Sequence, residues 1–189
     1  GAEIYRFNRV TSLSRSSSGS WVVHTEQGDI TCEIVVNAGG LWADRIAAMV
    51  DLYLPTMAIE HHHVLFADLP EIEAVEGELT SLRDPDVPYY LRKEGNSLLV
   101  GPYESNCKAW STNGVAWDWA QMDLPIDLER IQQYLLRLME RVPMLKDAGL
   151  KHICNGPIAY TPDGQQLLGP VYGAPNFYCL AGCNFGITQ

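Results

Sequence analysis

The segment from Ile30 to Val50 constrains the fold most, because an extended apolar run ends there in two glycines and passes directly into a helical pattern. Its first part, Ile30 to Val36, is rich in β-branched residues, which favour strands. The tight turn Asn37-Ala38-Gly39-Gly40 follows. After the turn, apolar residues recur at helical spacing, at Ile46, Met49 and Val50. Strand, turn and helix in direct succession indicate a chain that mixes both kinds of element.

Strand patterns account for much of the remaining chain. The run Trp21 to Thr25 and the run Ile30 to Val36 flank Gln27-Gly28-Asp29, which predicts a hairpin. Further extended runs are expected at residues 3–7, 59–66, 88–92, 98–103, 150–160, 166–168 and 176–181. Between Pro125 and Val142, apolar residues at three- and four-residue steps predict one amphipathic helix that covers a sheet. The predicted fold class is α+β (mixed α/β).

Composition excludes several classes of partner. The 13 basic and 23 acidic residues give a net charge of −10, which would be repelled by nucleic acid and by anionic membrane surfaces. No apolar run approaches the roughly 20 residues that span a bilayer. Five scattered cysteines without a C-x-x-C pair favour reduced thiols. Because the 189 residues begin at Gly1 and end in a glycine-rich turn, we expect an internal fragment of a longer protein.

His61, His62 and His63 are the most conspicuous candidates for chemistry. On a strand, His61 and His63 would share one face and His62 the other. One interpretation is a core histidine with two at a solvated face, and another places the pair in a substrate pocket as base or orienting group. A zinc site would need further ligands, such as His24 or His152, and no ligand spacing supports one.

Two other groups of residues have both a structural and a functional interpretation. Tyr90 and Arg92 would point the same way on a strand, so Arg92 could bind a substrate carboxylate or simply lie at the surface. Three tryptophans could line an apolar pocket or seal a loop: Trp110, Trp117 and Trp119. Likewise, the turns at Gly39-Gly40 and at 182–187 could present backbone N–H groups to a ligand, or serve packing alone.

The order of the sequence blocks resembles one enzyme family. The blocks are VVNAGGLWA, IEHHHVLF, SLRDPDVPYYLR, LLVGPYESN, LMERVPMLKDAG, NGPIAYTPDGQQLLGP and NFYCLAGCNFGI. Together they are similar to the FAD-dependent amine oxidoreductases of the D-amino-acid-oxidase superfamily, in particular the dimethylglycine and sarcosine dehydrogenases. The resemblance implies a p-hydroxybenzoate-hydroxylase-like architecture. In it, residues 1–56 and 150–189 belong to a discontinuous FAD-binding domain, and residues 57–149 form an antiparallel β-sheet substrate-binding domain backed by the amphipathic helix.

The resemblance also implies roles for particular residues. The expected FAD-binding residues are Val10, Gly39, Gly40, Trp42, Gly182, Cys183, Asn184, Phe185, Gly186 and Ile187. The candidate catalytic residues are His63, His61, Tyr90 and Arg92, with His63 favoured as base or orienting group and Arg92 as carboxylate clamp. Relatives usually carry tyrosine at the position of His63, which is a departure from the family pattern. No metal ligand is expected.

For the intact parent the resemblance implies oxidative demethylation of a small N-methylated amine. A hydride equivalent passes from the N-methyl carbon to FAD, and the resulting iminium yields formaldehyde or is intercepted by tetrahydrofolate bound to a C-terminal domain. The 189 residues contain no G-x-G-x-x-G fingerprint, so the fragment alone is expected to be inactive. The implied location is the bacterial cytoplasm, or the mitochondrial matrix in a eukaryote. Alternative hypotheses are a non-catalytic remnant that binds a small molecule or partner, and a hydrolytic metal site.

Overall fold

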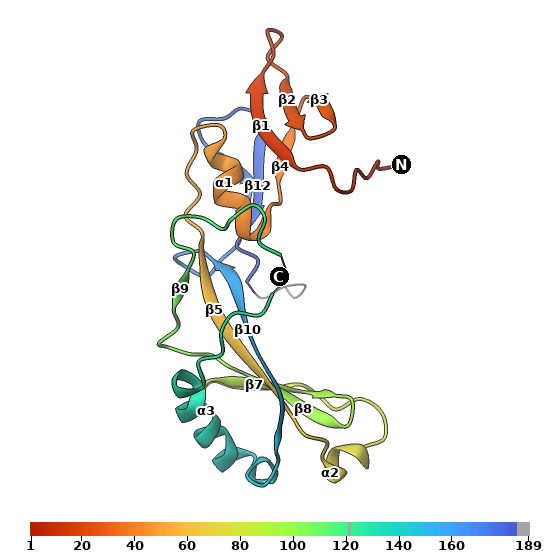
Figure 1. Cartoon of the computed structure of the whole chain (residues 1–189), viewed down its shortest axis with the longest axis vertical. Coiled ribbons are helices and arrows are strands. Elements are labelled where there is room, and N and C mark those ends of the chain that lie inside the picture. The colour runs from red at the N-terminus through yellow and green to blue at the C-terminus, as the bar shows by residue number, and fades with distance from the viewer. Residues whose placement is uncertain (121, 185–189) are drawn as a thin grey trace. The chain divides into compact units, whose positions relative to one another are not determined.

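The computed structural model describes residues 1–120 and 122–184 and divides the chain into two compact units (Figure 1). Unit 1 comprises Gly1–Ala58, Ser111–Asp118 and the described part of Ala159–Gln189, and unit 2 comprises Ile59–Trp110 and Trp119–Ile158. These bounds differ from the expected domain ranges mainly at 111–118, which lies in unit 1, and at 150–158, which lies in unit 2. The assignment of FAD to one range and substrate to the other stays a prediction.

Unit 1 contains two three-stranded sheets. The first is antiparallel in the order β1-β2-β3, with β1 at Val10–Arg15, β2 at Trp21–Thr25 and β3 at Gly28–Cys32. The second has the order β11-β12-β4, with β11 at Leu167–Pro170, β12 at Phe177–Ala181 and β4 at Val35–Asn37. β4 is parallel to β12 and is followed by the 3-10 turn η1, Gly40–Trp42, and the helix α1, Ala43–Ala48. The predicted hairpin and the strand-turn-helix order are therefore confirmed, but the expected single run Ile30 to Val36 is divided between β3 and β4, which lie in different sheets.

The N-terminal segment differs from the prediction. Residues 3–7 form no strand, and the apolar side chains of Ile4 and Phe7 are 83% and 86% exposed. A strand gains most of its stability from pairing with a neighbour, which an apolar pattern alone does not supply. The first strand is instead β1, whose serines obscured its strand pattern, and it is followed by a turn at Ser16–Ser20. Leu13 on β1 is buried against Trp21 and Phe177.

Unit 2 is built on an antiparallel sheet in the order β10-β5-β8-β7-β6, with the short β9 paired to β5. The strands are β5 Met57–Phe66, β6 Leu82–Asp84, β7 Tyr89–Glu94, β8 Ser97–Pro102, β9 Ala109–Trp110 and β10 Leu150–Tyr160. A short helix α2, Pro70–Glu73, follows β5, and the 3-10 turn η2, Pro143–Leu145, precedes β10. The segment Asn155-Gly156-Pro157, which resembles a turn in isolation, lies inside β10.

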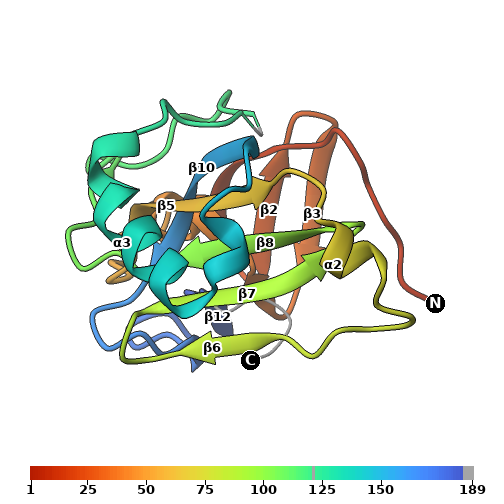
Figure 2. The ribbon, with the colours of Figure 1, turned by 90° about the horizontal axis from the view of Figure 1, so that it is seen from below.

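The predicted amphipathic helix is α3, Leu128–Arg141. Figure 2 shows it across one face of the sheet that holds β5, β7 and β8. Its residues Ile131, Leu135 and Leu138 are buried in one cluster with Val64 and Val100 of the sheet. An antiparallel sheet backed by an amphipathic helix is therefore confirmed. None of the helices in the described ranges is long and apolar enough to cross a membrane.

Candidate active site

Three aromatic rings meet on one face of the unit 2 sheet. His61 comes from β5, Tyr90 from β7 and Tyr103 from the chain just after β8. The Tyr90 hydroxyl lies 3.4 Å from His61 Nε2, and the two rings are nearly parallel, with centroids 6.1 Å apart. Tyr103 packs against both, with centroid distances of 5.5 Å to Tyr90 and 6.4 Å to His61. Of the four predicted catalytic residues, the structure pairs His61 and Tyr90.

Gly101 makes that pair possible. β8 lies between β5 and β7, and Tyr90 is paired with Gly101 across the β7-β8 ladder. A Cβ at position 101 would lie 2.1 Å from the Tyr90 ring and 2.2 Å from its hydroxyl, so no side chain fits there. The Tyr90 phenol therefore lies over the backbone of β8 and reaches toward β5. Sequence reasoning missed Gly101, because the need for a glycine arises only from the strand order.

Burial keeps His61 neutral. Desolvation is the largest influence and lowers the pKa of His61 below its ordinary value of about 6.5. The Glu104 carboxylate opposes this by raising the pKa, while His63 and His62 lower it further. At neutral pH the ring therefore carries one proton and has one nitrogen able to accept another, which is what a general base needs.

The other two predicted catalytic residues have different surroundings. The pKa of His63 is lowered by burial first and then by His152 and Arg92, against the effect of Asp123. Arg92 is exposed and forms an ion pair with Glu94 on the same strand. Their roles as base and carboxylate clamp stay predictions.

A buried polar cluster lies beside His61. His62 is the core histidine of the first interpretation, whereas its partners were not predicted. His62 is fully buried, and its Nδ1 is 2.6 Å from Glu104 Oε1. Arg130 of α3 donates to Glu60 Oε2 at 2.8 Å, and Asn155 of β10 donates to the same oxygen at 3.0 Å. Arg130 stands three residues after Asp127 and four before Tyr134, on the buried stripe of α3, so the helical spacing contained a signal for a buried arginine.

The cluster keeps Glu60 ionised. Burial acts first and would raise the pKa of Glu60, but the hydrogen bonds from Asn155 and Arg130 and the Arg130 charge outweigh it and lower the pKa. Buried carboxylates are tolerated when they are paired and hydrogen-bonded in this way. Because Glu60 of β5 stays charged and accepts hydrogen bonds from Arg130 of α3 and Asn155 of β10, the cluster fixes the contact between the sheet and the helix.

The first glycine turn of unit 1 is tightly packed. A Cβ at Gly39 would lie 2.4 Å from Ile46 Cδ1, and Asn37 fixes the turn by donating to Ala43 O at 2.8 Å and accepting from the Gly39 N–H. Gly40 has φ +56, which favours glycine, and a Cβ there would meet nothing. Trp42 Nε1 donates to Ala116 O at 2.9 Å. Packing explains Gly39, whereas the open space above Gly40 admits a ligand.

The second turn contains an unsatisfied amide. Gly182 has φ +71, and a Cβ there would lie 2.5 Å from Thr161 Cγ2. Next to Cys183, the Asn184 side-chain nitrogen and oxygen are buried and have no hydrogen-bond partner among the described residues. Buried polar groups nearly always have a partner, so this amide fits a site for a polar ligand such as FAD. Phe185, Gly186 and Ile187 lie outside the described residues, and Val10 begins β1 opposite Thr25.

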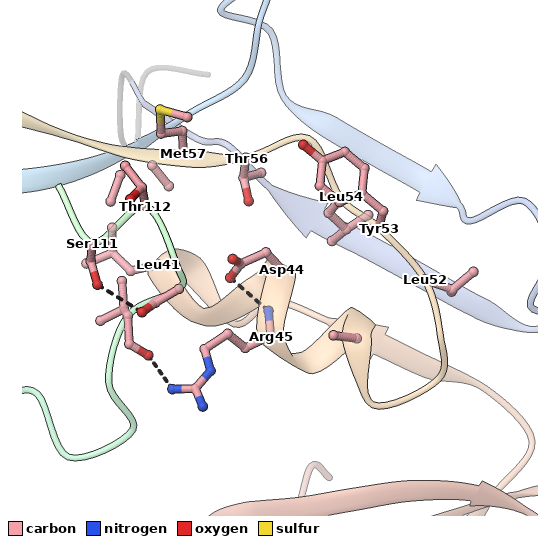
Figure 3. A pocket seen from close by; sticks show the side chains of 15 residues that line it. Leu41, Asp44, Arg45, Leu52, Tyr53, Leu54, Thr56, Met57, Ser111 and Thr112 are labelled. Carbon is pink, nitrogen blue, oxygen red and sulfur yellow. Dashed lines mark hydrogen bonds between the residues drawn. The ribbon is translucent and has the colours of Figure 1, made fainter. Parts of the chain in front are cut away.

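A separate pocket of about 250 Å³ lies in unit 1 (Figure 3). Helix α1 contributes Asp44 and Arg45 to its wall, and Arg45 Nη1 donates to Val115 O at 2.6 Å. Among the described residues, none of those predicted to bind the cofactor or to act in catalysis lines it. The three tryptophans do not line it either: Arg45 stacks on Trp117 in unit 1, while Trp110 and Trp119 pack together in unit 2 with centroids 5.1 Å apart.

Metal ligation has no support within residues 1–120 and 122–184. No group of three or more histidine, cysteine, aspartate or glutamate side chains there could hold a metal ion. His62 is instead held by Glu104 and the Asp127 backbone, and His61 faces Tyr90.

Comparison with known proteins identifies the family. The family model for FAD dependent oxidoreductases matches residues 1–189. Mitochondrial dimethylglycine dehydrogenase of Homo sapiens is 39% identical over 185 residues, which are 95% of this chain and 21% of that protein. Mitochondrial sarcosine dehydrogenase of Mus musculus is 33% identical over 165 residues, 86% of this chain and 17% of that protein. The chain thus spans about a fifth of the length of these relatives.

A solved structure supports the same fold. L-proline dehydrogenase from P. horikoshii superposes with a TM-score of 0.74 at 20% identity, covering 97% of this chain and 46% of that one. FAD is the cofactor of the matched family, and the resemblance of the sequence blocks is confirmed. The chain belongs to the FAD-dependent oxidoreductase family.

Proposed function

We propose that the protein carrying this chain uses FAD to oxidise small N-methylated amino acids of the dimethylglycine and sarcosine type. The observation that carries the proposal is the pairing of His61 with Tyr90 on the sheet of unit 2. This pairing places the neutral His61 imidazole beside the Tyr90 hydroxyl, among aromatic rings and partly shielded from water. The two relatives named above, which act on dimethylglycine and sarcosine, support the choice of substrate class.

The residues of this chain bind and deprotonate the amine in this proposal. FAD, when bound, supplies the two-electron oxidation. An N-methylated amino acid is an ammonium ion at neutral pH, and His61 Nε2 accepts its proton so that the nitrogen lone pair becomes available. Tyr90 and Tyr103 provide aromatic walls that favour a methylated cation before the proton leaves. Arg92 would hold the carboxylate, and His63 stays a candidate orienting group.

On the cofactor side, the two glycine turns of unit 1 would hold FAD. The open backbone at Gly40 and the unsatisfied Asn184 amide are the features that support this placement. Trp42, Gly182 and Cys183 belong to the same turns, and Val10 is proposed to contact the adenine. In the longer protein, tetrahydrofolate would accept the carbon unit, and the mitochondrial matrix is the proposed location in a eukaryote.

The test uses the intact flavoprotein under anaerobic conditions. Dimethylglycine or sarcosine should bleach the flavin absorbance near 450 nm, and glycine, which has no N-methyl group, should not. His61→Asn should slow bleaching about 10²- to 10⁴-fold, the usual worth of a general base. His24→Asn, in unit 1, serves as the control and should bleach at the wild-type rate. Formaldehyde assays with and without tetrahydrofolate then test the acceptor.

Two results would contradict the proposal. Flavin that stays oxidised with every N-methylated amino acid would favour the alternative of a non-catalytic binding protein. Normal bleaching in His61→Asn would leave the reaction class intact and remove His61 as its base.

A further inference from the structure

Glu104 is the buried carboxylate nearest to the candidate base. It lies two residues after the end of β8, and its side chain is only 1% exposed. One oxygen, Oε1, is 2.6 Å from His62 Nδ1, and the other, Oε2, is 3.9 Å from His61 Nδ1. The carboxylate therefore stands between two consecutive histidines whose rings lie on opposite faces of β5.

The hydrogen bonds of His62 define its proton. Its Nε2 accepts the backbone N–H of Asp127 at 3.1 Å, so that nitrogen carries no proton. A neutral imidazole then has its proton on Nδ1, where it is donated to Glu104. Arg130 Nη2 lies 3.1 Å from the same Nδ1, but a nitrogen that donates to Glu104 does not also accept from arginine. His62 thus contacts Glu104 through Nδ1 and the Asp127 N–H through Nε2.

Arg130 contacts the two carboxylates unequally. Its Nη2 is 2.8 Å from Glu60 Oε2, whereas its Nε is 3.9 Å from Glu104 Oε1. Glu104 is therefore the carboxylate with the more distant guanidinium, and its Oε2 faces His61.

We propose that Glu104 is a positioning residue for the oxidation: it holds the proton of His61 on Nδ1, so that Nε2 points to Tyr90 and the substrate as the accepting nitrogen. This inference rests on the proposed function of His61. A separation of 3.9 Å exceeds the length of a direct N–H···O bond, so the influence is electrostatic. Inside a protein, a unit charge at that distance is strong enough to select one tautomer of a neutral ring.

The groups that face His61 decide what its titration should show. They are Glu104, His62 and His63, together with the rings of Tyr90 and Tyr103. Glu104 raises the pKa of His61, against burial and the two histidines, which lower it. Removal of the Glu104 charge should therefore lower the pKa of His61 further.

The experiment compares Glu104→Gln with Glu60→Gln in the intact flavoprotein. Both changes remove one carboxylate of the same cluster, but of the two only Glu104 is among the groups that shift the pKa of His61. Glu104→Gln should slow flavin reduction by about 10- to 100-fold, less than the roughly 10⁴-fold effect of a directly bonded orienting carboxylate. It should also move the acid limb of the rate profile to lower pH. Glu60→Gln should leave that limb in place.

Nitrogen-15 spectra of labelled histidines, with His61→Asn for assignment, provide a readout independent of turnover. We expect His61 to be protonated on Nδ1 in the wild type and to lose that preference in Glu104→Gln. An unchanged His61 tautomer and titration in Glu104→Gln would overturn the inference, as would equal displacement of the acid limb by Glu60→Gln. A changed tautomer with an unchanged flavin reduction rate would support the positioning by Glu104 and contradict the proposed function of His61.

Discussion

At the scale of single residues, Gly101 controls the contact between Tyr90 and His61. The Tyr90 ring occupies the space that any larger residue at 101 would need, within 2.2 Å of a Cβ. Gly101→Ala should therefore displace Tyr90 and destabilise the protein by about 1–3 kcal/mol, the usual cost of overpacking. Thermal unfolding and the rate of flavin reduction measure the two effects.

Gly156→Ala is the matched control for that substitution. Gly156 lies on β10 of the same sheet, and a Cβ there would meet nothing within 4 Å. Its thermal midpoint should equal or exceed that of the wild type, because alanine lowers the entropy of the unfolded chain. If Gly101→Ala and Gly156→Ala had the same thermal midpoint and the same rate of flavin reduction, the position of Tyr90 would not depend on Gly101.

Residue burial also predicts how stability depends on pH. The pKa of His61 is lowered in the folded state, so below about pH 6.5 the unfolded chain binds a proton that the folded chain resists. The contribution of neutral His61 to the free energy of unfolding is therefore complete above about pH 6.5. It is lost as the pH falls toward the pKa that His61 has in the folded state. Between pH 7.5 and 5.5, the thermal midpoint should fall less in His61→Gln than in the wild type. Parallel curves would contradict the buried, neutral state of His61.

At the scale of elements, α3 offers two leucines of very different burial. Leu138 is 1% exposed in the core of unit 2, and Leu136, two residues earlier, is 56% exposed. Leu138→Ala should cost about 2–5 kcal/mol through the lost contacts and the cavity. Leu136→Ala should change stability by less than about 0.5 kcal/mol. Chemical denaturation of both variants checks the orientation of the helix.

The N-terminus of α3 depends on Asp127. Its carboxylate accepts the Arg130 N–H at 3.2 Å and also pairs with Lys108. Asp127→Ala should cost about 1 kcal/mol through loss of the cap. Asp127→Asn keeps the capping oxygen and loses only the exposed ion pair, so its cost should be well below that of the alanine variant. If the two variants were equally unstable, the ion pair and not the cap would be the important contact.

Elements with a regular spacing of apolar residues could be predicted from the sequence, and elements without such a spacing could not. The stripe of α3 and the alternation of β5 are local patterns, and the structure contains both. β1 was missed because its buried Leu13 stands among serines, and residues 3–7 were predicted wrongly because their apolar residues have the pattern of a strand but no pairing. Pairing is a property of two segments, so a single segment cannot reveal it.

At the scale of the whole molecule, the proposed cofactor site contains the two glycine turns, and the 189 residues include no G-x-G-x-x-G fingerprint. We expect these 189 residues alone to lose added FAD on desalting, because the glycine-rich fingerprint supplies the N–H groups that bind the pyrophosphate. An absorbance scan from about 350 to 500 nm measures what remains. Retained flavin would show that the two glycine turns suffice for binding.

The sequence by itself determined the family, the main strands, the amphipathic helix and the cofactor, because each depends on local periodicity or on the order of sequence blocks. It also named His61 and Tyr90 as candidates. Only the tertiary structure decided that these two face each other over Gly101, and that Glu104, His62 and Arg130 form a charged cluster beside them. Those contacts join residues as far as 68 positions apart, and they arise from strand order and from the burial of charge, which no local pattern encodes.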